Sequence, residues 1–218
     1  IHDFFYSGIS CGWNWGYEDN ISRDNHIEKN HIHDIGHGLL SDMGCIYTLG
    51  VQPGTVVRGN LVHDVKKAVY GGWGIYLDEG SSHILVENNI SYNVNSEPYT
   101  VHYGRENIVR NNIFAFGREA QVRLGRDEEH IAYTFEKNIV ITDGLPLYTG
   151  GRRWKVERTV IRCDLNLFWD VSGTPMLSGS TPHGLPQSRR LVRGAAAARR
   201  GAVRAGVRGE DGALQRDD

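Results

Sequence analysis

The chain has 218 residues, of which 27 are glycine and only 6 are proline, and its formal net charge is −2. That length fits one large domain or two small ones. No run approaches about 18 apolar residues, which excludes a transmembrane helix, and the near-neutral charge gives no reason to expect nucleic acid as a partner. The cysteine count of 3 is odd, with no CxxC pair, which argues against a disulfide framework.

A repeat with a period in the twenties runs along the chain. Six segments align without gaps on an asparagine or aspartate, at Asn30, Asn60, Asn89, Asn112, Asn138 and Asp164. The residue three places earlier is always apolar, from Ile27 to Ile161. The windows are short, β-branched and alternate with period two, so they predict strands. We expect an all-β parallel β-helix solenoid of about six coils, stacked about 4.8 Å apart.

Two columns of the repeat have a structural explanation. In register, the asparagines form a ladder whose side chains hydrogen-bond from coil to coil. Two places before the anchor the charge alternates in sign, through Glu28, Arg58, Glu87, Arg110, Glu136 and Arg162. Opposite charges on neighbouring strands stabilise a sheet by roughly 0.2–1 kcal/mol a pair. We therefore interpret both columns as structural rather than catalytic.

The composition changes near residue 180. From Ser180 to Asp218 there are eight Arg and four acidic residues, and no aromatic residue. Either this is a basic tail that binds an acidic polymer, or it is disordered or non-native sequence, which its lack of apolar residues favours. We place the β-helix in residues 1–179 and the tail in 180–218. Because the chain starts at Ile1 without Met, we expect the solenoid to be incomplete at its N-terminus.

A second aligned stretch carries the candidate chemistry. Aligning Gly80, Gly104, Gly125 and Gly150 places four polar side chains in one column: Asp78, His102, Arg123 and Tyr148. A neighbouring column brings Arg105 near Arg126. Buried charge is costly, so this column is either an active face or an exposed polar face of the solenoid. Three aromatic residues nearby could stack on sugar rings, namely Trp73, Tyr76 and Tyr103.

Asp42 is the second candidate carboxylate. Paired carboxyls about 5–5.5 Å apart suit a retaining glycosidase, and about 6.5–9.5 Å suits an inverting one. If the strand were fully extended, Asp42 and Asp78 would be offset by about 23 Å. A bend near Gly44 must bring Asp42 back for the pair to form. Glu79, beside Asp78, is a candidate substrate contact, and Glu79 and Glu106 are the fallback carboxylates.

Metal ligands are not clearly grouped. His33, His37 and His63 lie in turn-like stretches, and His31 and His33 are best interpreted as solvent-facing or core-capping. The run Asp127–Glu129 is either a calcium site or, more simply, a solvated loop. We therefore expect no metal.

Four sequence strings together resemble a known family: YSGISCGWNWGY, LSDMGCIYTLGVQPGT, YGGWGIYLDEGSS and HYGRENIVRNNIFAF. They are similar to right-handed parallel β-helix proteins of glycoside hydrolase family 141 and to secreted bacterial β-helix proteins for polysaccharide breakdown. The resemblance implies α-L-fucosidase or xylanase activity, a pair of catalytic aspartates at Asp42 and Asp78, and a secreted, periplasmic or cell-surface location. Cys45, where the family pattern has Gly, and Tyr99–Thr100–Val101, where a His-containing segment is expected, depart from it.

Three functions follow as hypotheses. The first is a cofactor-free glycoside hydrolase acting on a carbohydrate polymer, with Asp42 and Asp78 catalytic, His102 tuning Asp78, and Arg105 and Arg126 binding hydroxyls or a uronate. The second is a calcium-dependent polysaccharide lyase with Arg123 or His102 as base. The third is a non-catalytic glycan-binding solenoid.

Overall fold

The computed structural model describes residues 1–150 and 161–173, and these residues form three parallel six-stranded sheets. The first sheet contains β1 (Ile9–Cys11), β4 (Met43–Thr48), β7 (Gly72–Leu77), β10 (Tyr99–Val101), β13 (Val122–Leu124) and β16 (Tyr148–Gly150). The second contains β2 (His26–Glu28), β5 (Val56–Arg58), β8 (Leu85–Glu87), β11 (Asn107–Arg110), β14 (Tyr133–Glu136) and β17 (Ile161–Asp164). The third contains β3 (His31–Ile35), β6 (Leu61–Val65), β9 (Ile90–Val94), β12 (Ile113–Ala115), β15 (Ile139–Thr142) and β18 (Leu167–Asp170).

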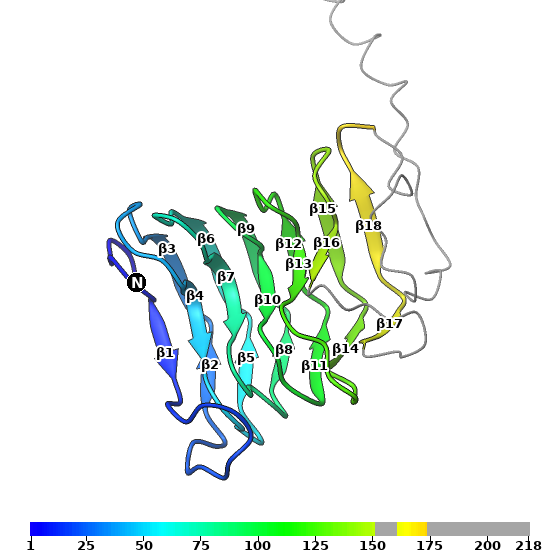
Figure 1. The fold of residues 1–218 in the computed structure, drawn as a ribbon. Coiled ribbons are helices and arrows are strands. Elements are labelled where there is room, and N and C mark those ends of the chain that lie inside the picture. The colour runs from blue at the N-terminus through cyan, green and yellow to red at the C-terminus, as the bar shows by residue number, and fades with distance from the viewer. Residues whose placement is uncertain (151–160, 174–218) are drawn as a thin grey trace, which may run out of the picture.

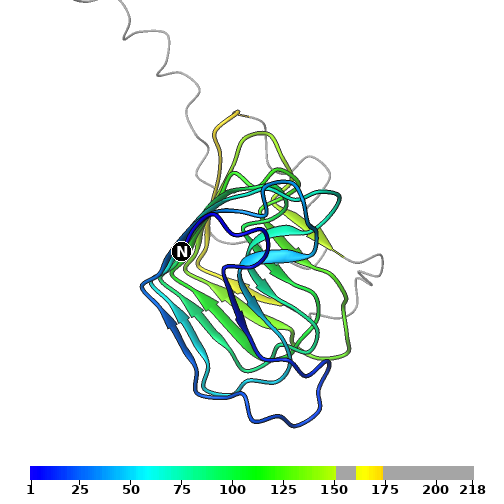
Figure 2. The ribbon, with the colours of Figure 1, turned by 90° about the vertical axis from the view of Figure 1, so that its left-hand side faces the viewer.

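The chain visits the three sheets in turn, so each coil contributes one strand to each sheet. Every strand pairs in parallel with the equivalent strands one coil away (Figure 1). Viewed along the stack, the coils superpose around a shared interior (Figure 2). The expected all-β parallel solenoid of about six coils is therefore confirmed.

The interior is filled by side chains from all three sheets. Because side chains alternate across a strand, every second residue points inward, and columns of Ile, Val and aromatic residues stack on one another. Val57, Val86 and Val109 are fully buried in the second sheet, and Ile32 and Val62 in the third. In the described part of the chain these residues belong to a single hydrophobic cluster, so the solenoid has no separate lobes there.

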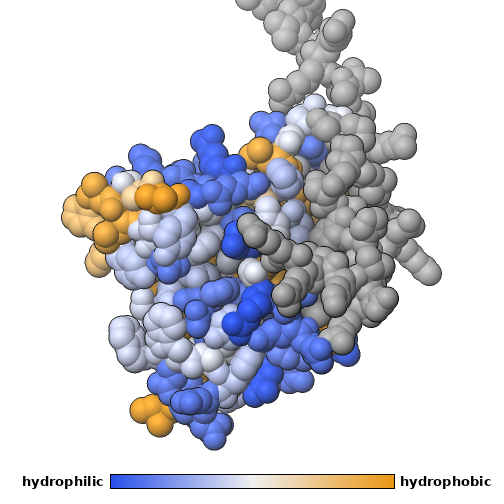
Figure 3. All heavy atoms as spheres, viewed as in Figure 1, coloured by the Kyte–Doolittle hydropathy of each residue, from blue (hydrophilic) through white to orange (hydrophobic). Residues whose placement is uncertain are grey.

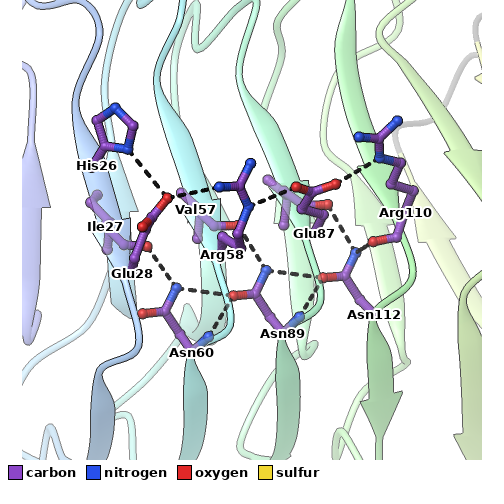
Figure 4. Close-up of polar contacts among 11 residues, drawn as sticks. His26, Ile27, Glu28, Val57, Arg58, Asn60, Glu87, Asn89, Arg110 and Asn112 are labelled. Carbon is purple, nitrogen blue, oxygen red and sulfur yellow. Dashed lines mark hydrogen bonds and ion pairs between the residues drawn. The ribbon is translucent and has the colours of Figure 1, made fainter.

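The asparagine ladder forms as expected, with one correction (Figure 4). In the middle coils, Asn89 Nδ2 donates to Asn112 Oδ1 at 2.9 Å and to the Val57 carbonyl at 2.9 Å. The sixth member is Asn166, not Asp164, because the last coil is two residues longer than the ungapped alignment assumed. A carboxylate has no N–H to donate, whereas Asn166 Nδ2 donates to the Phe135 carbonyl at 2.8 Å.

The charge ladder on the outside of the second sheet is also confirmed over most of its length. Arg58 Nε and Arg110 Nε each donate to a Glu87 carboxylate oxygen at 2.7 Å, and Arg58 Nη1 reaches Glu28 at 3.2 Å (Figure 4). At the last coil, the expectation was wrong. Glu136 pairs in register with Asp164, and Arg162 with Thr134, since the same two-residue shift moves the whole strand.

The expected tail of residues 180–218, and the boundary at residue 179, lie outside the described residues. Within the part of the chain that the structure describes, no helix is long and apolar enough to cross a membrane.

Candidate active face

Asp78 follows directly after β7 and is held by three donors on the outer face of the first sheet. Its Oδ1 accepts hydrogen bonds from Tyr76 Oη at 2.6 Å and from His102 Nδ1 at 3.0 Å, and its Oδ2 accepts one from Tyr47 Oη at 2.5 Å. The donors come from three consecutive coils. The stacking of Asp78 and His102 on one flank is therefore confirmed.

Asp42 returns to this flank because β4 bends. Cys45 and Ile46 are neighbours in sequence and both fully buried, which breaks the alternation of a straight strand. Gly44 stands at the bend, where an added Cβ would lie 3.0 Å from the Tyr76 Cβ. Asp42 itself has a φ of 61°, in the left-handed region that Asp tolerates better than most residues. The bend near Gly44 that the pairing required is present.

One hydroxyl group contacts both carboxylates. Tyr76 Oη lies 2.6 Å from Asp78 Oδ1 and 3.3 Å from Asp42 Oδ1. Those two carboxylate oxygens are therefore at most about 6 Å apart, which brings the two carboxyl groups within the range of separations that two-carboxylate glycosidases use. A hydroxyl has a single proton, so Tyr76 can donate to only one of them at a time.

The two carboxyl groups have pKa values shifted in opposite directions. Burial, followed by the negative charge of Asp78, raises the pKa of Asp42. Burial also acts to raise the pKa of Asp78, but hydrogen bonds from His102, Tyr47 and Tyr76 outweigh it and lower that pKa overall. Near neutral pH Asp78 is ionised, while Asp42 is the group that more readily carries a proton. Opposed shifts of this kind mark acid and base partners in enzymes.

A second layer of polar groups lies beside Asp78. Tyr103 Oη donates to Glu79 Oε2 at 2.9 Å, and His102 Nδ1 lies 3.8 Å from Glu79 Oε1. The Arg126 guanidinium lies over the Tyr103 ring, 3.4 Å from its centroid, and pairs with Glu128 at 2.7 Å. Of the sequence-predicted residues, Glu79, His102, Tyr103 and Arg126 therefore do gather next to Asp78.

Two members of the predicted column are misplaced. Arg123 pairs in register with Thr100 and Tyr76, two positions before His102 and Asp78 along their strands. Arg123 therefore lies on the same face of the sheet as His102 and Asp78, but two residues earlier along the strand. Tyr148 pairs with Val122 and points into the core, where only 9% of it is exposed. The glycine alignment failed here because Val101 pairs with Leu124, 23 residues later, whereas Gly104 and Gly125 are only 21 residues apart, so this coil is longer than the glycine spacing implies.

Arg105 and Glu106 also lie apart from the pair. Arg105 and Arg126 do not occupy equivalent positions on neighbouring coils, as the alignment expected. The Arg126 backbone N–H donates to the carbonyl of His102, whereas that alignment would require it to donate to the carbonyl of Gly104. Arg105 instead lies over the Tyr17 ring, 5.0 Å from its centroid. Glu106 pairs with His83 at 3.3 Å.

The three aromatic residues expected to stack on sugar rings are largely buried, since only 6% of Trp73, 3% of Tyr76 and 6% of Tyr103 is exposed. Their polar atoms are used inside the protein. Trp73 Nε1 donates to Glu97 Oε2 at 2.7 Å, and the Trp73 ring packs on Tyr76 at 4.1 Å between centroids. These aromatic residues support the carboxylates and leave little ring face for a ligand.

Sequence reasoning missed several residues of this face. Tyr6 donates to the Asp42 carbonyl at 2.7 Å, the negative charge of Asp42 raises the pKa of Tyr70, and Tyr47 donates to Asp78. Glu97 is fully buried, and burial raises its pKa. The shared Ile-Tyr pair at residues 46–47 and 75–76 was a usable signal, because it predicted that Tyr47 stacks on Tyr76 beside Asp78. The space-filling view shows this face as polar through its centre (Figure 3).

The other candidate ligands have protein partners. Glu128 interacts with Tyr17, Arg126 and His130. His31 is exposed, as expected, and its Nε2 lies 2.8 Å from His63 Nε2, while the His33 and His63 rings stack at 5.2 Å. Among residues 1–150 and 161–173, no group of three or more His, Cys, Asp or Glu side chains is placed to hold a metal ion.

Comparison with known proteins agrees with this architecture. A family model described as a right-handed β-helix region matches residues 15–161. The chain belongs to the right-handed β-helix family. Many members of this family degrade polysaccharides. Searches of curated proteins and of solved structures gave no match.

Proposed function

We propose that this right-handed β-helix protein is a retaining glycoside hydrolase acting on a carbohydrate polymer, with Asp78 as nucleophile and Asp42 as acid and base. One observation carries the proposal. The Tyr76 hydroxyl contacts both carboxyl groups, whose pKa values are shifted in opposite directions. A retaining glycosidase needs such a pair of neighbouring carboxyl groups, one protonated and one ionised.

The chemistry proceeds in two displacements. In the first, the protonated Asp42 donates its proton to the glycosidic oxygen while an Asp78 oxygen attacks the anomeric carbon. The bond to the leaving sugar breaks, and a glycosyl ester forms on Asp78. In the second, the ionised Asp42 takes a proton from water, the water oxygen attacks the anomeric carbon, and Asp78 leaves as carboxylate. No cofactor enters either step.

The surrounding donors suit these roles. Three hydrogen bonds keep Asp78 ionised and fix its orientation before attack, since each favours the charged form. Tyr76 can donate to Asp78 while Asp42 holds its own proton, and can turn to Asp42 once that proton has left. His102, partly exposed beside Asp78, is placed to contact a sugar hydroxyl. The four sequence strings quoted above support membership of glycoside hydrolase family 141, and with it secretion, as part of the same proposal.

The test is hydrolysis of plant and microbial polysaccharides by the purified chain, with reducing ends as the readout. Asp78→Asn and Asp42→Asn are each expected to lower kcat by about 10³-fold or more. Glu106→Gln removes a carboxylate away from the pair and serves as the matched control, with activity retained. In a retaining enzyme, azide rescues an Asp78→Ala variant by attacking the anomeric carbon, and the product is a glycosyl azide of inverted configuration.

Three results would reject the proposal. Full activity in Asp78→Asn would show that Asp78 is not the nucleophile. Unsaturated products that absorb in the ultraviolet and vanish with a chelator would indicate the lyase. Glycan binding with no turnover of any polymer would indicate a non-catalytic solenoid.

A further inference from the structure

The segment between β1 and β2 runs across the coils instead of around them. We call residues 12–20 the strap. Its Asn14 carbonyl oxygen would lie 2.3 Å from a Cβ added to Gly50, and its Gly16 carbonyl oxygen 1.9 Å from one added to Gly80. The Gly16 N–H donates to the Glu79 carbonyl at 3.4 Å. Gly50 and Gly80 follow β4 and β7, so the strap crosses successive coils at the ends of the strands that carry Asp78 and its neighbours.

Tyr17 pins the far end of the strap. Its hydroxyl donates to the Glu128 carboxylate and lies 3.2 Å from His130 Nε2. Its ring meets the Tyr103 ring edge to face at 5.7 Å and lies under Arg105. Burial and the bond to Glu128 raise the pKa of Tyr17, so its hydroxyl keeps its proton. The strap is therefore tied to the same second layer that includes Glu79 and Arg126.

This course turns two tryptophans outward. The carbonyl oxygens of Asn14 and Gly16 are turned toward Gly50 and Gly80 of the solenoid, whereas the indole rings of the neighbouring residues are turned to solvent. Trp13 is 83% exposed and Trp15 is 64% exposed. Exposed tryptophan is unusual on a surface that binds nothing, and the rings that sequence analysis expected to bind sugars are buried. The strap supplies what Trp73, Tyr76 and Tyr103 cannot, namely free indole faces, on a segment whose backbone contacts Glu79, the residue after Asp78.

We propose that Trp13 and Trp15 form a binding platform for pyranose rings of a polysaccharide, beside the point where its chain is cleaved. The inference rests on the proposed function and deepens it. Pyranose rings present an apolar C–H face to an indole and their hydroxyls to water, so stacked rings lose little hydration. A platform on the strap, which runs along the stack, would hold sugars on one side of the scissile bond and make the enzyme favour polymers over short oligosaccharides.

The experiment measures binding without turnover. In the Asp78→Asn background, the chain is run through native gels containing soluble xylan, xyloglucan, mannan or pectin, one at a time, and the dissociation constant is taken from the retardation. Trp13→Ala and Trp15→Ala are each expected to weaken binding about tenfold. Trp13→Phe and Trp15→Phe should restore part of it. Trp169→Ala is the matched control, because Trp169 is 43% exposed on β18 of the third sheet, and binding should not change.

The outcomes separate the two proposals. Loss of retardation in the Trp13 and Trp15 variants, with Trp169→Ala unaffected and circular dichroism unchanged, supports the platform. Equal retardation of all variants, or no retardation of the parent on any of the four polysaccharides, overturns it. If the platform is found while the unmodified chain hydrolyses nothing, the hydrolase proposal fails and the platform stands. If polymers are cleaved and the Trp variants cleave them with unchanged KM, the platform proposal fails and the hydrolase proposal stands.

Discussion

Replacing Asn89 by aspartate should destabilise the solenoid more than the small change in the side chain suggests. Asn89 is fully buried. Its Nδ2 donates to the Val57 carbonyl and to Asn112 Oδ1, and its Oδ1 accepts from the backbone N–H and the side-chain Nδ2 of Asn60. Aspartate keeps the acceptor and loses the two donors. Each buried acceptor left unpaired costs about 1–3 kcal/mol, and the carboxylate must also be buried. We expect a loss of about 3–5 kcal/mol in the free energy of unfolding at neutral pH.

The loss should be smaller in acid. Burial and the facing carbonyl oxygens would raise the pKa of the new carboxyl group above its unfolded value. Protonation restores one donor, so the deficit is largest above the folded pKa and shrinks as the pH falls towards the unfolded value near 4. Other carboxylates also titrate there, so the unmodified chain is measured at each pH.

The assay is urea unfolding followed by circular dichroism, at pH 7.5 and pH 4.5. Asn88→Asp is the matched control, because Asn88 is the preceding residue, is exposed and has a φ of 57° that aspartate tolerates. It should change stability by less than about 0.5 kcal/mol. Equal effects at the two positions, or an Asn89→Asp deficit that does not shrink in acid, would refute the role assigned to the ladder.

Four further predictions concern the carboxyl groups. The pH profile of kcat/KM should be bell-shaped, falling in acid as Asp78 is protonated and falling at higher pH as Asp42 loses its proton. Tyr76→Phe should move the acidic limb to higher pH, because Asp78 loses a donor that lowers its pKa; an unmoved limb would count against that bond. Glu97→Leu removes the buried acceptor of Trp73 Nε1 and of the Thr149 hydroxyl, so urea unfolding should show a loss of about 1–3 kcal/mol. Glu87→Gln should cost about 1–2 kcal/mol at pH 7 and nothing at pH 2, because the lowered pKa of Glu87 contributes stability above its unfolded value that disappears in acid.

The fold was predictable because the strand register of a solenoid is visible in the sequence as a repeat. The asparagine and charge columns are local in each coil, so aligning short segments recovered the strand pairing from Asn30 to Asn138. The error at the last coil had a physical source. Coil length varies at the turns, and the ungapped alignment chose Asp164 where the ladder needs a donor, which two residues later Asn166 supplies.

The site was less predictable than the fold. Asp78 and His102 follow from register alone, but the Asp42–Asp78 contact depends on the bend at Cys45–Ile46, which a repeat alignment cannot show. The sequence placed Trp73 and Tyr76 near Asp78 but could not show that they are buried, because their burial depends on the neighbouring coils. The strap carries no repeat pattern, so its course across the coils could be seen only in three dimensions.

The position of the two carboxylates in the stack of coils has a consequence for how the protein would unfold. A linear array in which each layer touches only its neighbours loses layers from an end, one after another. The groups that hold the two carboxylates lie on β4, β7 and β10 and their adjoining turns. Erosion that starts at β18 must therefore remove the layers of β16 and β13 before it reaches them, whereas erosion from β1 reaches β4 after a single layer. The geometry of the carboxylates should thus survive loss of the last coils but not loss of the first.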